Sequence, residues 1–206
     1  MNISKNILIT ISLVTLFTVL DSKANEEAKA LYQQCVACHG ENGQGVEALK
    51  SPQIAGQEDW YIERQLLAFA NGHRGADAKD SYGAQMVAIA KTLTKEQVKT
   101  LSAYVVSMPA TDIVESLEGD LKKGYSAYQA KCGVCHGAAA EGNKVLNAPR
   151  LNNLTNEYLV RQMQNFSTGV RGVHKDDKYG RQMAMMSRTV SEQETKDILA
   201  FIGSQK

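Results

Sequence analysis

Residues 35–39 read Cys-Val-Ala-Cys-His, and residues 132–136 read Cys-Gly-Val-Cys-His. These two C-x-x-C-H motifs use all 4 cysteines of the chain. Two thiols three positions apart lie on one helical turn, so both can reach the vinyl groups of one porphyrin, and the histidine that follows lies under the iron. The pattern is typical of c-type haem attachment. It predicts two covalently attached haem c groups, held by Cys35, Cys38, Cys132 and Cys135, with His39 and His136 as iron ligands.

Other uses of paired cysteines fit the motifs less well. Two disulfides would suit an exported protein, but neither a disulfide nor a redox C-x-x-C pair calls for the histidine that follows. A zinc site shared by both motifs would need segments 97 residues apart to face each other. Haem attachment is therefore the preferred interpretation.

The offset of 97 residues runs through both halves of the chain, which identifies a tandem duplication. Aligned without a gap, proline, tyrosine, glycine and Arg-Gln positions recur in both halves. The sequence predicts a signal peptide over 1–24, a domain over 25–108, a linker over 109–119 and a second domain over 120–206.

Each half is predicted to be helical. Helices are expected over residues 28–38 and 122–135, with the haem motif on their last turn, and apolar residues recur at helical spacing after each motif. The last helix of each half opens with a capping-box sequence, Thr94 with Gln97 and Ser191 with Glu194. No period-2 pattern indicates a strand. The fold class is all-α, with two small domains whose cores depend on the porphyrin for apolar surface.

Each iron needs a sixth ligand unless it binds an external molecule. Met86 and its repeat partner Met183 are expected to supply it, from a loop before the last helix of each half. A thioether ligand favours ferrous iron and suits an electron carrier. Core methionines are the alternative, and Met186 is the reserve for Met183. His73 and His174 have no histidine partner in the repeat and are expected at the surface.

Further residues are candidates for contacts around the haem. A proline stands 13 residues after each ligand histidine, placed to present a backbone carbonyl to the second ring nitrogen, although a plain loop turn remains an alternative. An arginine in each Gly-x-Arg-Gly turn is a candidate for a propionate, or for a solvated loop position. A tyrosine eight residues later either donates to a propionate or packs on the ring edge. These are Pro52 and Pro149, Arg74 and Arg171, and Tyr82 and Tyr179.

The N-terminus predicts export. Lys5 precedes the apolar residues 7–20, and Ser22 and Ala24 place small residues before a cleavage point. The run is too short to span a bilayer comfortably, since about 20 residues are expected. A cleaved signal peptide and a periplasmic protein follow, with an uncleaved anchor as the alternative.

Charge excludes one class of partner and divides the two halves. The 206 residues carry 23 basic and 22 acidic side chains, so no basic excess favours nucleic acid. Residues 25–112 hold 8 basic and 11 acidic residues (8 − 11 = −3), and residues 113–206 hold 13 and 10 (13 − 10 = +3). Such a dipole can steer a charged partner, and the basic half is the candidate docking side.

Taken together, the paired motifs, prolines and methionines, with Ile54-Ala55-Gly56-Gln57 in the first half, resemble the cytochrome c4 family. That resemblance implies two class I cytochrome c domains, each with one haem, and His/Met ligation by His39 with Met86 and by His136 with Met183. It also implies Pro52 and Pro149 carbonyls on the histidines. One departure is Asn152-Asn153-Leu154, which replaces Ala55-Gly56-Gln57.

The resemblance implies a function and partners. Electrons would pass from quinol–cytochrome c reductase to a haem–copper terminal oxidase, with peripheral membrane association through those partners. A dihaem subunit of a dehydrogenase, such as flavocytochrome sulfide dehydrogenase, is the alternative. A dihaem peroxidase or thiosulfate-oxidising enzyme would need an open axial position or a cysteine ligand, and no spare cysteine exists. The prediction is an electron carrier, not an enzyme.

Overall fold

We describe the protein from a computed structural model, which covers residues 25–113 and 118–205. The predicted signal peptide, residues 1–24, and part of the predicted linker therefore lie outside the described residues. Within the two described ranges, no helix is long and apolar enough to cross a membrane.

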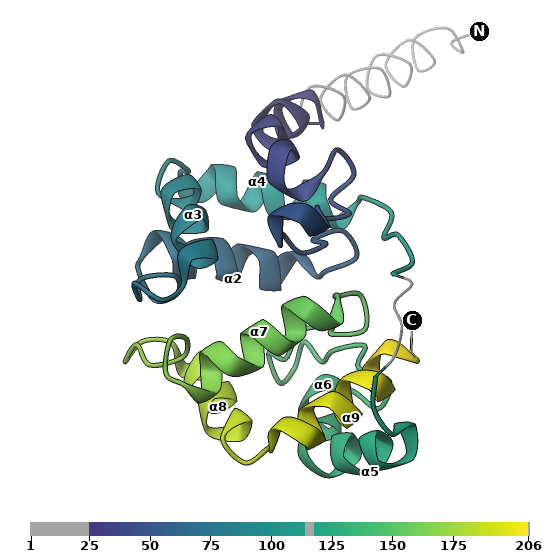
Figure 1. Cartoon of the computed structure of the whole chain (residues 1–206). Coiled ribbons are helices and arrows are strands. Elements are labelled where there is room, and N and C mark those ends of the chain that lie inside the picture. Colours follow the sequence, from purple (N-terminus) through teal and green to yellow (C-terminus); the bar gives the residue numbers. More distant parts are fainter. Residues whose placement is uncertain (1–24, 114–117, 206) are drawn as a thin grey trace, which may run out of the picture.

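Both halves follow the same order of elements (Figure 1). The first half has a helix over residues 25–39, then η1 (Glu47–Leu49), α2 (Asp59–Ala70), α3 (Ser81–Ala90) and α4 (Lys95–Val106). The second has α5 (Leu121–Lys131), α6 (Gly133–His136), α7 (Asn156–Ser167), α8 (Lys178–Ser187) and α9 (Glu192–Gly203). Strand-like pairing among the described residues is limited to two isolated bridges, Val46 with Ser51 and Asn143 with Ala148, which are repeat partners. The all-α prediction is confirmed.

Each half has its own apolar core, which makes it a domain. The first core gathers Tyr32, Ile62, Leu101 and Val105, from the N-terminal helix, α2 and α4. The second gathers equivalent side chains from α5, α7 and α9, including Tyr128, Leu159, Ile198 and Ile202. In the first domain the core packs the final helix against the helix that carries the haem motif, and in the second against α5, which precedes the motif.

The predicted capping boxes are confirmed at both final helices. The Thr94 side chain accepts the Gln97 N–H at the start of α4 while the Gln97 side chain accepts the Thr94 N–H. Ser191 and Glu194 repeat this exchange at α9. Each box satisfies backbone donors that the first helical turn leaves unpaired.

The prediction of one helix over residues 122–135 is wrong, because the chain breaks between α5 and α6. Cys132 leaves helical geometry, with φ −122° and ψ −41°. Tyr32 and Tyr128 explain the break. Each is fully buried and donates its hydroxyl at 2.7 Å to a backbone carbonyl, Tyr32 to Gly40 and Tyr128 to Gly137. Tyr128 lies four residues before its motif, whereas Tyr32 lies three residues before its own. The chain accommodates this extra residue by leaving helical geometry at Cys132.

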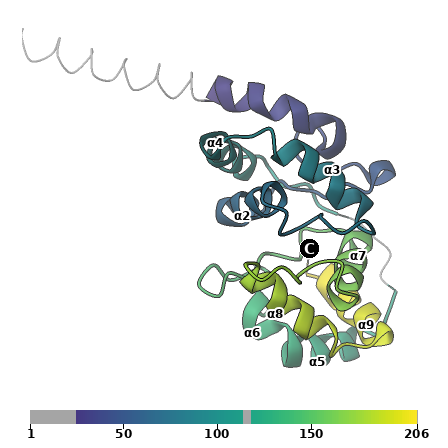
Figure 2. The ribbon, with the colours of Figure 1, turned by 90° about the vertical axis from the view of Figure 1, so that its left-hand side faces the viewer.

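The two domains meet face to face through α2 and α7 (Figures 1 and 2). Two of the hydrogen bonds that cross the interface obey the repeat. Arg64 of α2 donates to the Asn147 carbonyl at 3.0 Å, and Arg161 of α7 donates to the Lys50 carbonyl at 2.7 Å. The interface is thus pseudo-symmetric around these two arginines.

Candidate haem sites

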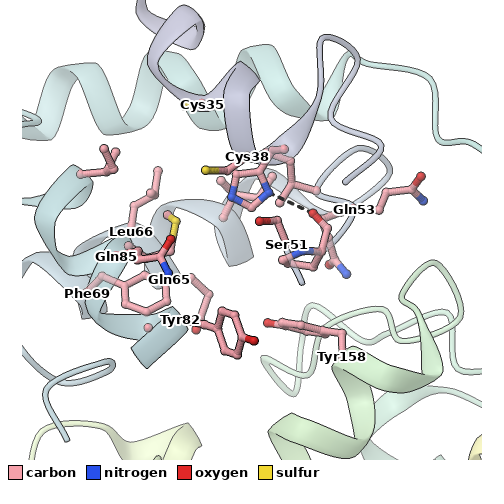
Figure 3. Close-up of a pocket in the computed structure, with 18 of the residues that line it drawn as sticks. Cys35, Cys38, Ser51, Gln53, Gln65, Leu66, Phe69, Tyr82, Gln85 and Tyr158 are labelled. Atoms are coloured by element: carbon pink, nitrogen blue, oxygen red, sulfur yellow. Dashed lines mark hydrogen bonds between the residues drawn. The ribbon is translucent and has the colours of Figure 1, made fainter. Parts of the chain in front are cut away.

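The first haem motif opens onto a cavity that is lined mostly by its own domain and closed on one side by residues of the second. Cys35, Cys38, His39 and Met86 line it together with apolar side chains, among them Ile54, Ile62, Leu66, Phe69, Leu93, Leu101 and Val105. Figure 3 shows Leu66 and Phe69 at one side and Tyr158 approaching from α7 of the other domain. The thiols, a ring nitrogen and a thioether therefore face one apolar space, which is the chemistry a porphyrin requires.

The histidine of each haem motif is oriented by a proline carbonyl. His39 Nδ1 lies 2.9 Å from the Pro52 oxygen, and His136 Nδ1 lies 2.8 Å from the Pro149 oxygen. Burial lowers the pKa of both histidines, more than the proline contact raises it. A neutral imidazole that donates from Nδ1 keeps Nε2 available as an iron ligand.

The four motif cysteines are not paired with one another in disulfides. Burial raises the pKa of Cys35 to about 11, with a smaller contribution from Cys38. Burial likewise raises the pKa of Cys132 to about 11. The disulfide alternative thus has no support in the structure.

The candidate methionine ligands lie on helices, so the prediction that they come from a loop is wrong. Met86 belongs to α3 and Met183 to the equivalent helix α8. Each of these helices begins at an aspartate, Asp80 or Asp177, whose side chain accepts a backbone N–H three residues on. Met183 is partly buried, whereas the reserve candidate Met186 is 40% exposed.

Arg74 and Arg171 are buried at the domain interface rather than solvated. Arg74 donates at 2.7 Å to Gln65 of its own domain, and to Gln162 and Tyr158 of the other at 3.1 and 2.9 Å. Arg171 reciprocates, donating to Gln162 at 2.6 Å and to Gln65 at 2.8 Å.

These partners are neutral side chains, and the Nε atoms of both arginines are buried without a hydrogen-bond partner. Two buried cations with spare donors call for an anion nearby. Haem propionates would meet that need, and the arginine at the first cavity lines it directly. The residues present therefore fit a porphyrin.

Tyr82 and Tyr179 contact arginines of the opposite domain. The Arg161 guanidinium lies 4.7 Å from the Tyr82 ring centroid, and the Arg64 guanidinium lies 4.8 Å from that of Tyr179. Two roles were expected for these tyrosines, donation to a propionate or packing on the ring edge, and the sequence contains no sign of this interdomain contact.

The departure at Asn152-Asn153-Leu154 has a structural reason. Asn153 is buried at the interface, where its amide donates to the Ala55 carbonyl at 3.1 Å and accepts from Gln57 at 2.9 Å. Its backbone carbonyl also accepts from Gln53 at 3.1 Å. An asparagine in place of Gly56 thus joins the domains, in an asymmetric contact that the repeat does not contain.

Comparison with known proteins gives the family. The cytochrome c family profile matches residues 25–109 and again residues 121–206. The chain belongs to the cytochrome c family. With one C-x-x-C-H motif in each matched copy, this cytochrome c carries two covalently bound haem c groups and transfers electrons.

The relatives support the resemblance to cytochrome c4, which is confirmed. Cytochrome c4 from Thiocapsa roseopersicina is 29% identical over 177 residues, covering 82% of this chain and 85% of that protein. A thiosulfate dehydrogenase electron acceptor from Stutzerimonas stutzeri (strain A1501) is 26% identical over 180 residues, covering 82% and 78%. Cytochrome c4 from Acidithiobacillus ferrooxidans has the same fold, with a TM-score of 0.69 at 24% identity over 84% of this chain and 99% of that one.

Most of the contacts at the interface could not be predicted from the sequence. Gln65 and Gln162 each accept hydrogen bonds from both buried arginines, and they recur in the repeat as part of Arg-Gln pairs. That recurrence was the available signal, but nothing in the pattern tells which domain each pair faces. Tyr158 carried no signal beyond its recurrence as Tyr61.

Proposed function

We propose that this cytochrome c is a periplasmic electron carrier in which His39 and Met86 are the axial ligands of one iron, and His136 and Met183 those of the other. Each haem supplies a one-electron ferric/ferrous couple. The supporting observation is that both halves place a carbonyl-held imidazole and a methionine on equivalent elements. An iron with two protein ligands has no open position for a substrate, which favours a carrier over an enzyme.

The optical spectrum of the purified holoprotein, oxidised and reduced, with and without carbon monoxide, tests this proposal. We expect two haems per chain, a ferric methionine–iron charge-transfer band, and no change on adding carbon monoxide to the reduced protein. Carbon monoxide binding at either haem would mean an open axial position and would favour the enzyme class instead.

We further propose quinol–cytochrome c reductase as the donor and a haem–copper oxidase as the acceptor. The likeness to cytochrome c4 proteins supports this assignment, and the basic second domain is the candidate docking side for an acidic partner. Membranes containing both complexes should reduce the protein with quinol and oxidise it with oxygen. Association rates that do not fall with added salt would contradict electrostatic docking.

A second candidate donor is a thiosulfate dehydrogenase, because the relative from Stutzerimonas stutzeri bears the name of that enzyme's electron acceptor. Reduction of the protein by thiosulfate and a purified thiosulfate dehydrogenase, faster than by the quinol pathway, would favour it. Copurification with a flavoprotein would instead favour the dehydrogenase-subunit alternative.

A further inference from the structure

The two histidines outside the haem motifs meet at the domain interface. His73 lies in the connection between α2 and α3, and His174 lies in the connection between α7 and α8. Their rings stack with centroids 4.2 Å apart and 19° between the planes. The repeat does not produce this pair, because Val170 is the partner of His73 and Asp77 is the partner of His174. The pair forms only when the domains assemble. Both histidines were expected at the surface, and their contact with each other was not predicted.

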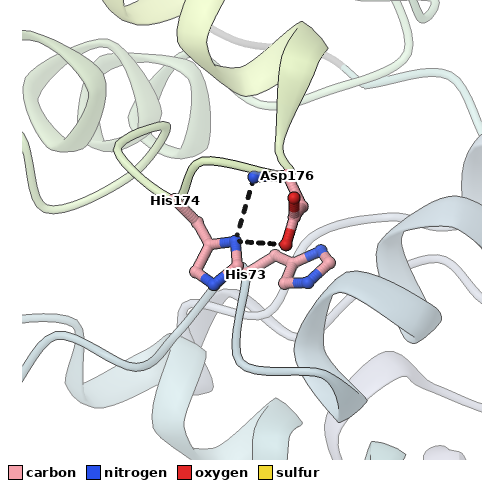
Figure 4. A group of neighbouring side chains, drawn as sticks. All are labelled: His73, His174 and Asp176. Carbon is pink, nitrogen blue, oxygen red and sulfur yellow. Dashed lines mark hydrogen bonds and ion pairs between the residues drawn. The ribbon is translucent and has the colours of Figure 1, made fainter.

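A carboxylate completes the cluster (Figure 4). Asp176 Oδ2 lies 3.9 Å from His174 Nδ1. One ligand atom from each of His73, His174 and Asp176 lies within 4.8 Å of the other two. Two imidazole nitrogens and a carboxylate are a donor set that zinc and neighbouring divalent transition metals favour. We propose that these three residues bind a divalent transition-metal ion, with Zn²⁺ as the reference ion, which bridges the two haem domains.

Binding requires the two stacked rings to rotate apart, because rings 19° from parallel direct their nitrogen lone pairs side by side rather than toward one point. Donors of a tetrahedral zinc ion, with bonds of about 2.0–2.1 Å, stand about 3.3 Å apart. Both histidines are partly buried and Asp176 is exposed, all on connections between helices, so side-chain rotation can close the difference. The Asp176 N–H, 3.2 Å from His174 Nδ1, already turns that nitrogen toward the carboxylate. That weak hydrogen bond gives way when a metal takes the nitrogen lone pair.

One cation already competes for the carboxylate. Lys175 Nζ lies 3.5 Å from Asp176 Oδ2, but the lysine side chain is 85% exposed. Exposed ion pairs contribute little to stability. The lysine can therefore move into solvent, and Lys175→Ala should strengthen metal binding by removing a like charge from the site.

The position of the cluster explains what a metal would do there. Figure 1 shows the α2–α3 and α7–α8 connections at one edge of the interface, while residues 107–113 leave the first domain at the opposite edge. The covalent chain thus joins the domains on one side only. A metal ion held by His73 and His174 would join them on the other side and restrict their relative rotation.

Calorimetric titration of the oxidised, chelator-treated holoprotein with ZnCl₂ tests the proposal. We expect one Zn²⁺ per chain in the wild type. Loss of an outer contact alone weakens metal sites about 10–100-fold, so His73→Gln and His174→Gln should each bind at least about tenfold more weakly. Asp176→Asn should bind Zn²⁺ more weakly than Asp112→Asn does. The second variant is a matched control, because it removes the same charge from an exposed residue at the opposite edge of the interface. Unchanged haem spectra establish that each variant is folded.

Three results would overturn the proposal. The first is a wild type without stoichiometric Zn²⁺ binding. The second is a pair of histidine variants that bind as tightly as the wild type. The third is loss of binding in only one of the two, which would place the metal within a single domain. None of these depends on the identity of the electron donor or on the axial ligands of the haems.

Discussion

Asn153→Ala is the most direct test of how the two domains are joined. Asn153 is 8% exposed, and its side chain makes two interdomain hydrogen bonds, to the Ala55 carbonyl and from the Gln57 amide, at 3.1 and 2.9 Å. A hydrogen bond of this kind contributes about 0.5–1.5 kcal/mol net. The loss should be about 1–3 kcal/mol, toward the upper end because the Ala55 carbonyl loses its side-chain partner.

The neighbouring residue provides the matched control. Asn152 is partly buried and donates within its own domain, to the Ala139 carbonyl at 3.0 Å. Both substitutions remove one amide from adjacent positions, but only Asn153→Ala removes contacts to the first domain. The control therefore separates loss of the interface from loss of local stability.

Trp60 makes the effect observable in the other domain. It is the only tryptophan of the chain and lies in α2 of the first domain. In denaturant titrations of the holoprotein, Asn153→Ala should lower the midpoint of the Trp60 fluorescence transition, and Asn152→Ala should lower it by less than half as much. An Asn153→Ala midpoint no lower than that of the control would refute the assignment of these hydrogen bonds to domain coupling.

Three more expectations concern the second domain. Met183→Ala should abolish the methionine–iron charge-transfer band of one haem while Met186→Ala preserves it; the opposite pattern would make Met186 the ligand. In the wild type, the contact with Lys131, helped by the capping contacts, lowers the pKa of Glu194 from 4.5 to about 2. Glu194→Gln keeps the capping box but removes this ion pair. Because the folded-state pKa of Glu194 is depressed, the ion pair stabilises the folded protein above pH 4.5, and this stabilisation is lost as the pH falls toward 2. If the wild type were still more stable than the variant by the same amount at pH 2, the expectation would be contradicted. Gly124→Ala should destabilise by about 1–3 kcal/mol, because a Cβ there would overlap the backbone of α9, and an unchanged denaturation midpoint would show that the helices can separate at no cost.

The local features of the protein could be predicted because they depend on neighbours in the sequence. The haem motifs and both capping boxes follow from residue types at short spacings, which fix helical turns and caps directly. The two-domain repeat follows from self-similarity of the sequence at one fixed offset. The proline contacts were also predictable, since Pro52 and Pro149 recur at the same distance from His39 and His136. The prediction of a loop at Met86 was wrong because this segment has no strong helical periodicity, although Asp80 caps the start of α3.

Contacts between the domains could not be predicted, because they depend on how two finished surfaces meet. The sequence shows that Arg74 and Arg171 recur, and the tertiary structure decides that each also donates to a glutamine of the opposite domain. The break at Cys132 also depends on the tertiary structure, since the buried hydroxyl of Tyr128 must reach the carbonyl equivalent to the one that Tyr32 reaches in the first domain. The sequence alone determined that the chain holds two haems in two helical domains, through covalent chemistry and local spacing. Only the tertiary structure decided the face on which the domains meet, and with it the pairing of His73 with His174, because burial and charge balance across a surface are properties of the assembled chain.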